Sequence, residues 1–441
     1  MARKIRQQIF PKEFPEPRMS YSPGIKAGPW IFVAGQIASE YSERGMHPNA
    51  TRDPLTPYLQ PAEVRLQAFY SLPNLEKVLT TGGSSFDRTV RIDQFMVLED
   101  TPDGEPNEVS EYIRTRNELI PEPTGMPAST AVGCSHLLCK PCIVEVDFLA
   151  LTGEADWKKE VINSSRVPRL PWGDNHAVRA GPYVFCSGQL AANGSEGSAP
   201  SAPASPTAWY GNDMERQTQF ILDRLSTVLE DAGSSLDLTV KAQVYLTAQG
   251  MKQIWKLDDV WKEYFPKNPP ARTITPAEGL ALKECLVEIN LVALTKDSGI
   301  KPETVKARGV PKWPLHEPHA VKAGNLLFLS TGIASDDKGR VPKDVQVNPF
   351  FPWYEKGIRK QTDYILSNAE KIVKAAGGSG FDNIMRRQCF HSDYDEFILS
   401  WEVWEKKFPH APPASTTIEV SGVPLPVPGA TLALDIWAYI P

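Results

Sequence analysis

The stretch Gly181-Pro182-Tyr183-Val184-Phe185-Cys186-Ser187-Gly188-Gln189-Leu190-Ala191 occurs in this chain in three related forms. The other two copies are Gly28–Ala38 and Gly324–Ala334, so the copies begin 153 residues (181 − 28) and 143 residues (324 − 181) apart. A repeat of this period in a chain of 441 residues predicts three copies of one structural unit. We expect these units at residues 1–158, 159–308 and 309–441.

The same order of local patterns follows each copy. In the second unit, apolar residues recur at helical spacing from Phe220 to Leu229 and Gly233 follows as a helix-ending residue. A β-rich run at 239–247, a second helical pattern and an apolar strand at 287–294 complete the unit. The order predicts an α+β fold, a mixed sheet with two helices on one face. Because the other sheet face must also be buried, we expect a pseudo-threefold barrel with the helices outside.

Composition narrows the function classes. The chain is 41% hydrophobic and 23% charged, with a net charge of −6 and no long run of like charges, which gives no reason to expect a nucleic-acid or membrane partner. The basic Met1–Gln8 is not followed by the apolar core of a signal peptide, so we expect a soluble, cytoplasmic protein. No phosphate-binding glycine loop or dinucleotide fingerprint occurs, and we predict no organic cofactor.

Several motifs together resemble the RidA/YjgF family of enamine and imine deaminases. They are the opening Gly181–Gln189, the turn Ala232–Asp237, the segment Phe265–Arg272 and the closing strand from Val287. The second unit matches best, and the other two keep the frame but lose signature residues. Because members of this family are homotrimers with ligand sites between subunits, the resemblance implies chorismate-mutase-like units fused into a pseudo-trimeric monomer. Further homo-oligomerisation stays open.

The resemblance implies a hydrolytic deaminase with a small-molecule substrate. Arg272 would grip the carboxylate of a 2-imino acid, and Glu288 or Glu145 would orient or activate the attacking water. The chemistry fits, because a guanidinium matches a carboxylate bidentately and a carboxylate can act as general base. Tyr21, Ser187 and Gly188 would line the site. In the other units we match Ser187 with Ala34 and Thr331, and Glu288 with Glu145 and Asp435.

Arg272 has no arginine counterpart, because Ser129 and Ser415 stand in its place in the other units. We therefore expect one working cleft, between the first and second units, in which Tyr21 and Glu145 complete the site around Arg272. A serine with an adjacent base can be a nucleophile, so a second hypothesis is a cyclic amide hydrolase similar to cyanuric acid hydrolases and barbiturases. A third hypothesis is a non-catalytic ligand-binding or scaffold protein.

Other residues invite a functional interpretation. His176 and His319 occupy equivalent positions and would act as acid or base near a cleft, or only hold a loop. Cys134, His136, Cys139 and Cys142 are zinc-type ligands, but their close spacing favours ordinary thiols and we predict no metal site. Two further sets concern the clefts and the surface: Trp172, Trp313, Trp353 and Trp401 are expected near clefts that suit a flat substrate, and the polar segment 193–206 is expected to be a surface loop.

Overall fold

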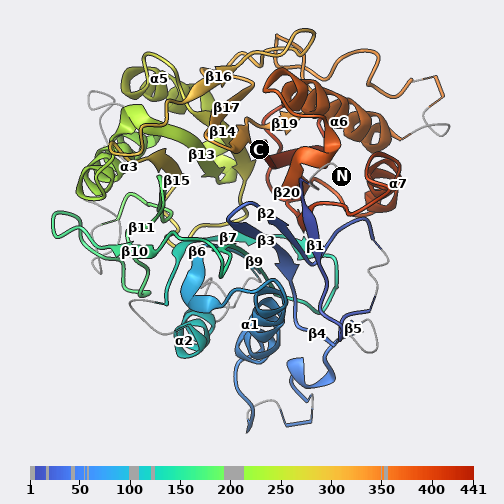
Figure 1. Ribbon diagram of the computed structural model, residues 1–441. Helices are drawn as coiled ribbons and strands as arrows, with labels where there is room; N and C mark the ends of the chain where they lie inside the picture. The colour runs from blue at the N-terminus through green and yellow to red at the C-terminus, as the bar shows by residue number, and fades with distance from the viewer. Residues whose placement is uncertain are drawn as a thin grey trace.

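A computed structural model describes residues 5–15, 19–40, 45–53, 55–56, 59–98, 109–120, 125–192, 213–348, 350–351 and 356–441. The segment 193–206 and Trp353 lie outside these residues. Figure 1 shows three α+β units around a common centre, with the sheets inside and the helices outside. In the described part of the chain, none of the helices combines the length and apolarity needed to cross a membrane.

Each unit contributes one mixed sheet. In spatial order, the first sheet contains β1 (Gln7–Ile9), β2 (Gly24–Ala27), β3 (Trp30–Gln36), β9 (Val144–Leu151), β6 (Thr89–Val97) and β7 (Ala128–Cys134). The second contains β10 (Lys159–Ile162), β11 (Ala177–Ala180), β12 (Tyr183–Cys186), β15 (Val287–Leu294), β13 (Thr239–Leu246) and β14 (Ala271–Pro276). The third contains β16 (Glu303–Val305), β17 (Ala320–Ala323), β18 (Leu326–Leu329), β22 (Leu432–Tyr439), β20 (Ile384–His391) and β21 (Ala414–Glu419).

Short strands extend this frame. The strand β8 (His136–Leu137) of the first unit adds to the edge of β21 in the third sheet, and β19 (Gly332–Ile333) pairs with β22. The strands β4 (Ser39–Glu40) and β5 (Gly45–Met46) form a separate pair. The predicted boundary at 308/309 assigns residues 303–305 to the second unit, whereas β16 pairs with β17 of the third sheet.

Two main helices cover the outer face of each sheet, in the order that the sequence predicts. The long ones are α1 (Glu63–Thr81), α3 (Asp213–Asp231) and α6 (Gly357–Ala375), and the short ones are α2 (Val109–Leu119), α5 (Ile254–Tyr264) and α7 (Phe397–Lys407). A single turn, α4 (Ala248–Met251), precedes α5. Gly233 follows α3 with a φ of 75°, a left-handed conformation that glycine adopts without steric cost and that ends the helix.

The inner sheet faces pack against one another. Trp30 of the first unit lies edge-on to Tyr183 of the second at 5.6 Å, and the Tyr183 hydroxyl donates to the carbonyl of Ala323 in the third at 2.6 Å. Aromatic and aliphatic side chains from all three sheets form one fully buried cluster around these residues. The predicted burial of the inner faces is therefore present, but the described strands remain three separate sheets and no sheet closes into a barrel.

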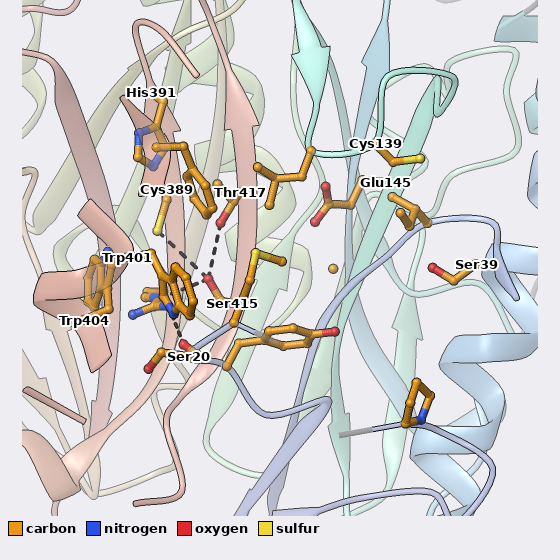
Figure 2. A pocket seen from close by; sticks show the side chains of 18 residues that line it. Ser20, Ser39, Cys139, Glu145, Cys389, His391, Trp401, Trp404, Ser415 and Thr417 are labelled. Carbon is orange, nitrogen blue, oxygen red and sulfur yellow. Dashed lines mark hydrogen bonds between the residues drawn. The ribbon is translucent and has the colours of Figure 1, made fainter. Parts of the chain in front are cut away.

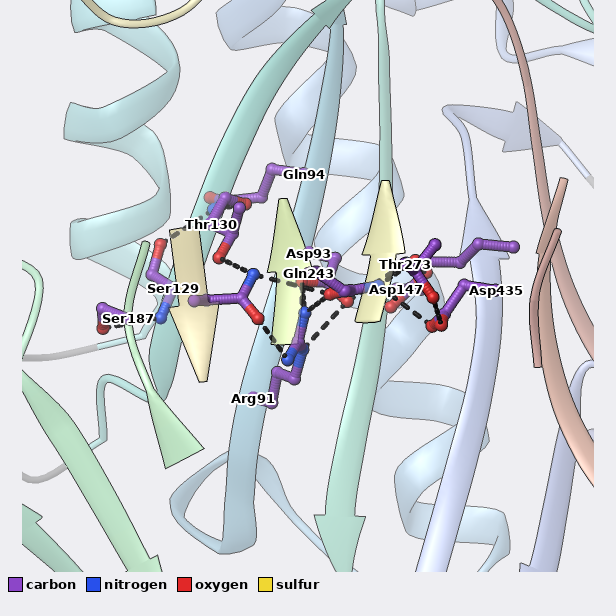
Figure 3. A network of polar contacts seen from close by, with 12 residues as sticks. Arg91, Asp93, Gln94, Ser129, Thr130, Asp147, Ser187, Gln243, Thr273 and Asp435 are labelled. Carbon is purple, nitrogen blue, oxygen red and sulfur yellow. Dashed lines mark hydrogen bonds and ion pairs between the residues drawn. The ribbon is translucent and has the colours of Figure 1, made fainter. Parts of the chain in front are cut away.

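A central network of buried charges joins the three units, and Figure 3 shows the part of it around Arg91, Asp93, Asp147 and Asp435. Arg386 of the third unit contacts Asp93 and Asp147 of the first, with Arg386 Nη2 at 3.2 Å from Asp147 Oδ1. Lys241 of the second unit lies 2.6 Å from Asp435 of the third, and Arg91 of the first unit donates to Asn290 Oδ1 of the second at 3.0 Å. Each unit is thus bound to the next, and an uncompensated member would cost several kcal/mol, about 3 to 5 for a broken buried pair.

Candidate active site

The strand registers show which residues are equivalent. Ser129, Arg272 and Ser415 lie opposite Ile92, Ala242 and Arg387 respectively on the parallel neighbouring strand, so the predicted correspondence of these three positions is confirmed. Glu145 lies opposite Phe95 and Glu288 opposite Tyr245, and the third sheet has Ala433 opposite Phe390.

The predicted match between Asp435 and Glu288 is wrong. Asp435 lies opposite Gln388, as Asp147 lies opposite Asp93. Asp435 and Asp147 therefore occupy equivalent positions, and both belong to the central network of buried charges. The spacing from Ser415 to Ala433 is 18 residues, whereas that from Arg272 to Glu288 is 16, because the proline-rich segment before β22 is longer. For this reason the register could not be read from the sequence. The third unit therefore has an alanine, Ala433, where the others have a glutamate.

Arg272 lies in the cleft between the second and third units, and the prediction that it joins Tyr21 and Glu145 is wrong. Its side chain is 0% exposed. Its Nη2 donates to Asp258 at 2.6 Å and its Nε to Glu317 of the third unit at 3.1 Å, while its Nη1 has no partner among the described residues. Burial raises the pKa of Glu317 to about 7, and the charge of Arg272 opposes that rise. Arg272 is neutralised by the protein itself.

The cleft between the second and third units has no glutamate at the position of Glu145 and Glu288, and Thr331 makes the backbone hydrogen bond in its place. Thr331 occupies the position of Gly35 and Gly188 in the other units. The equivalence is seen in the hydrogen bonds: the Thr331 N–H donates to the Arg272 carbonyl, as the Gly188 N–H donates to the Ser129 carbonyl. The Thr331 hydroxyl accepts from the N–H of Ile274 at 2.9 Å. Ser330, not the predicted Thr331, corresponds to Ser187: each accepts the N–H of the neighbouring unit's strand and donates to its own loop carbonyl.

The cleft between the first and third units encloses a cavity of about 420 Å³. Tyr21, Gly35 and Glu145 line it from the first unit, and Arg387 and Ser415 line it from the third. Figure 2 shows Glu145 on one side of the cavity and Ser415 and Thr417 on the facing strand. Tyr21 and Glu145 are therefore brought together, as predicted, but with Arg387 rather than Arg272.

Arg387 is the arginine of this cavity. It is 5% exposed, donates through Nε to Ser415 Oγ at 2.9 Å and through Nη2 to the Ser20 carbonyl at 2.6 Å, and its guanidinium stacks on Trp404 at 3.6 Å. Among the described residues, its Nη1 has no hydrogen-bond partner and no carboxylate forms an ion pair with it. Burial lowers the pKa of Arg387 to about 10. A buried guanidinium of this kind is chemically able to bind an anion.

Glu145 supplies an acid to the same cavity. Burial raises its pKa to about 8, the N–H of Thr417 across the cleft donates to its carboxylate and opposes the rise, and the charge of Asp147 adds to it. Gly35 makes room for this carboxyl, because a Cβ there would lie 1.9 Å from Glu145 Oε1. A carboxyl that titrates near neutral pH can accept and donate a proton under ordinary conditions.

The third cleft, between the first and second units, also encloses a cavity, of about 380 Å³. Glu288, Gly188, Ser129 and Asp174 line it together with Arg116 from α2. Arg116 lies 2.9 Å from Asp174 and donates to Ser129 Oγ at 3.2 Å. Each cleft therefore contains a buried arginine on a different element: Arg272 on β14, Arg387 on β20 and Arg116 on α2.

The remaining predicted site residues have structural contacts. Ser187 Oγ accepts from the Ser129 N–H at 2.9 Å and joins two units. His176 Nδ1 accepts from the N–H of Ser164, and His319 Nδ1 from that of Ala307, each at 3.0 Å, so each ring holds the loop between the first two strands of its sheet. Neither histidine lines the inter-unit cavities of about 420 and 380 Å³.

The serine nucleophile predicted by the hydrolase hypothesis lacks a base in the described residues. Ser129 Oγ accepts from Gln94 and Arg116, and Ser415 Oγ accepts from Arg387. A guanidinium that donates to a hydroxyl oxygen does not remove its proton. These contacts favour a positioning role for both serines.

The cysteine segment makes contacts of another kind. His136 Nδ1 lies 3.0 Å from Glu419 Oε2, Cys142 Sγ lies 3.6 Å from Met46 Sδ, and Cys139 lines the cavity beside Glu145. In the part of the chain that the structure describes, no three potential ligands gather as a metal would require. Of the described tryptophans predicted near clefts, Trp401 lines the larger cavity, Trp172 the second and Trp313 a small one in the third unit.

Fold and clefts define a class of protein: three fused α+β units with ligand-sized cavities between units. The sequence profile described as endoribonuclease L-PSP matches residues 12–152, 168–295 and 316–440. This chain belongs to that family, the RidA/YjgF proteins, and carries the family domain three times in tandem.

Sequence relatives match one unit at a time. A RutC family protein of Pyrococcus horikoshii is 32% identical over 135 residues, which are 31% of this chain and 97% of that protein. The chloroplastic Reactive Intermediate Deaminase A of Arabidopsis thaliana is 28% identical over 128 residues, 29% of this chain and 62% of that protein. Among solved structures, an endoribonuclease L-PSP-type protein of Entamoeba histolytica is 29% identical over 31% of this chain and 99% of that one, with a TM-score of 0.26.

Proposed function

We propose that the cleft between the first and third units hydrolyses the C=N bond of a 2-imino acid, giving a 2-oxo acid and ammonia. The observation that carries the proposal is Arg387, a buried guanidinium that has no carboxylate partner in the described part of the chain and that lines a cavity of about 420 Å³. A substrate carboxylate would neutralise it and be held in a fixed orientation. Membership in a family with a reactive intermediate deaminase supports the reaction class.

Glu145 is the proton carrier in this proposal. As water adds to the carbon of the iminium, the ionised Glu145 takes one proton from the water and the C=N electron pair moves to nitrogen, which gives a carbinolamine. Glu145 returns the proton to nitrogen, ammonia leaves, and the remaining oxygen forms the 2-oxo group while its proton passes to solvent. The iminium charge favours the ionised form of Glu145, so binding of the substrate itself prepares the base.

The lining of the cavity indicates the substrate side chain. Phe397, Trp401 and Trp404 line it together with Ile37 and Leu138. Aromatic walls bind flat apolar groups through area burial and ring contacts. We therefore expect an aromatic or bulky aliphatic 2-imino acid rather than the smallest ones.

The test compares Arg387→Met and Arg387→Lys with the unaltered protein, using 2-imino-3-phenylpropanoate generated in the assay and measuring ammonia release. Arg387→Met should lose at least about a hundredfold in kcat/KM, about 2.7 kcal/mol of transition-state binding, and Arg387→Lys should recover part of it. Arg359→Gln removes an exposed arginine of α6 that pairs with Glu402, and it should behave as the unaltered protein.

An imine without a carboxylate separates anchoring from damage to the fold. Hydrolysis of such an imine should change little in Arg387→Met, because the guanidinium would contact the substrate only through its carboxylate. Full activity of folded Arg387→Met on the imino acid would refute the proposed site. Absence of catalysed ammonia release by the unaltered protein would refute the proposed reaction.

A further inference from the structure

The second cavity, between the first and second units, has a different charge pattern from the proposed active site. All three nitrogens of Arg116 are occupied: Nη2 contacts Asp174 at 2.9 Å and the Trp172 carbonyl at 2.7 Å, Nη1 contacts Gln94 and Ser129, and Nε contacts Asn117 at 3.1 Å. The side chain is fully buried. Arg116 therefore has no group left for a ligand carboxylate.

Glu288 is the polar group that remains available in this cavity. It is 4% exposed, lines the cavity, and its Oε2 has no partner among the described residues. Gly188 leaves space for the carboxyl, because a Cβ there would lie 1.9 Å from Glu288 Oε1. A buried acceptor without a partner is costly, which makes this carboxyl ready to receive a donor from a ligand.

The net charge of the second cavity disfavours an anionic ligand. Arg116 and Asp174 cancel, and Glu288 adds a negative charge when ionised, so a bound carboxylate would meet no free positive charge. A ligand ammonium beside an ionised Glu288 would instead leave the cavity neutral. The other walls are apolar, formed by Met96, Leu98, Leu190, Leu280 and Trp172 among others.

We propose that this cavity is a second ligand site, specific for a primary amine with an apolar or aromatic body and without a carboxylate. The ammonium group donates to Glu288, and the body packs against Trp172 and the aliphatic walls. Asp174 is the specificity-determining residue, because it keeps Arg116 occupied. The first and second cavities thus select opposite charges on otherwise similar ligands.

Proton release is a signature of such binding. Burial raises the pKa of Glu288 to about 8, and the negative charges of Asp174 and Asp93 add to the rise. At pH 7 the empty site therefore holds a largely protonated carboxyl, which must lose its proton when an ammonium binds. The charged and titratable groups around it are Asp174, Arg116, Tyr112, Asp93 and Cys285.

The experiment titrates the full chain with 2-phenylethylammonium and, separately, with phenylacetate by isothermal calorimetry at pH 7 in buffers of different ionisation enthalpy. The amine should bind with release of protons. Glu288→Gln should weaken it at least about tenfold and abolish the buffer dependence, since one charge-assisted hydrogen bond is lost. Arg359→Gln serves as the control, and melting curves establish that each variant is folded.

Asp174→Asn provides a second, independent readout. It removes the counter-charge of Arg116 and leaves the cavity more positive, so affinity for the amine should fall and affinity for phenylacetate should rise at least about tenfold over that of the unaltered protein. The proposal is overturned if the amine fails to bind at tens of millimolar, if its affinity is unchanged in both variants, or if Asp174→Asn gains no affinity for phenylacetate.

Discussion

The clefts on either side of the third unit are built on the same frame, yet only one of them is open. In the closed cleft Arg272 is held by Asp258 and Glu317, while the open cleft has Trp401 and Tyr21 at the corresponding positions and Arg387 lies over the ring of Trp404. A guanidinium beside two carboxylates is neutralised as a structural ion pair, whereas one that has only hydroxyl, carbonyl and aromatic neighbours among the described residues keeps its charge for an anion. The comparison teaches that the partners of an arginine, more than its presence in a motif, determine whether a cleft can bind an anion.

The acid follows the same division. The open cleft keeps Glu145 over Gly35, and the closed cleft has Ala433 and Thr331 at the equivalent positions. Thr331 satisfies the backbone N–H of Ile274, as the Glu145 carboxylate satisfies that of Thr417. Because the replacement preserves the backbone hydrogen bond while removing the acid, the closed cleft is a stable remnant rather than a damaged site.

The largest effect that would sharpen this comparison concerns Glu145→Gln. The amide keeps an acceptor for the Thr417 N–H but cannot carry a proton, so we expect kcat for imino acid hydrolysis to fall by about 10² to 10⁴. In the unaltered protein, kcat/KM should rise with pH up to about 8 as the carboxyl ionises, and this limb should vanish in the variant. A variant that keeps both the rate and the limb would break the assignment of the open cleft.

Arg272→Met tests the closed cleft. It leaves Glu317 buried without its ion-pair partner and Asp258 with Lys262 alone, so we expect a loss of about 3 to 5 kcal/mol in the free energy of unfolding, measured in urea. Imino acid hydrolysis by the folded fraction should stay unchanged well below the melting temperature. Loss of activity in a fully folded sample would show that the second and third units form a working site after all.

The fold could be predicted further than the site because it depends on patterns that repeat. The openings at Gly28, Gly181 and Gly324 and the helical spacing in 220–229 specify hairpins and helices locally, and three copies reinforce one another. The packing of one sheet on the next depends on contacts between residues far apart in sequence. The prediction of a closed barrel therefore went beyond what the pattern supports.

The site residues that sequence reasoning missed are Arg387 and Arg116. Each places a guanidinium beside the serine that stands at the motif position, but from a different element: Arg387 lies on the strand next to Ser415, and Arg116 reaches Ser129 from the helix α2. A signal for Arg387 was present in the alternation of β20, where Arg386 faces the central charges and Arg387 must face the opposite side of the strand. No comparable signal marks Arg116, because helical arginines are usually solvated.

The smallest expected effect is the loss of folding stability caused by burying Glu145 in the open cleft. The pKa of Glu145 is raised to about 8 in the folded state, so the unfolded chain ionises first and stability falls as pH rises from the unfolded value near 4.5 to about 8. Glu145→Gln should therefore stabilise the protein by about 1 to 3 kcal/mol at pH 8 and by little at pH 4.

Glu288, with a similarly raised pKa, should give a matched result in Glu288→Gln. The double variant should show the sum of the two gains, because the sites lie in different clefts. Urea unfolding at pH 4, 6 and 8 measures both. A destabilised Glu145→Gln at pH 8 would mean that the carboxylate is already paired in the folded protein, and the contrast between an open, strained cleft and a closed, relaxed one would then fail.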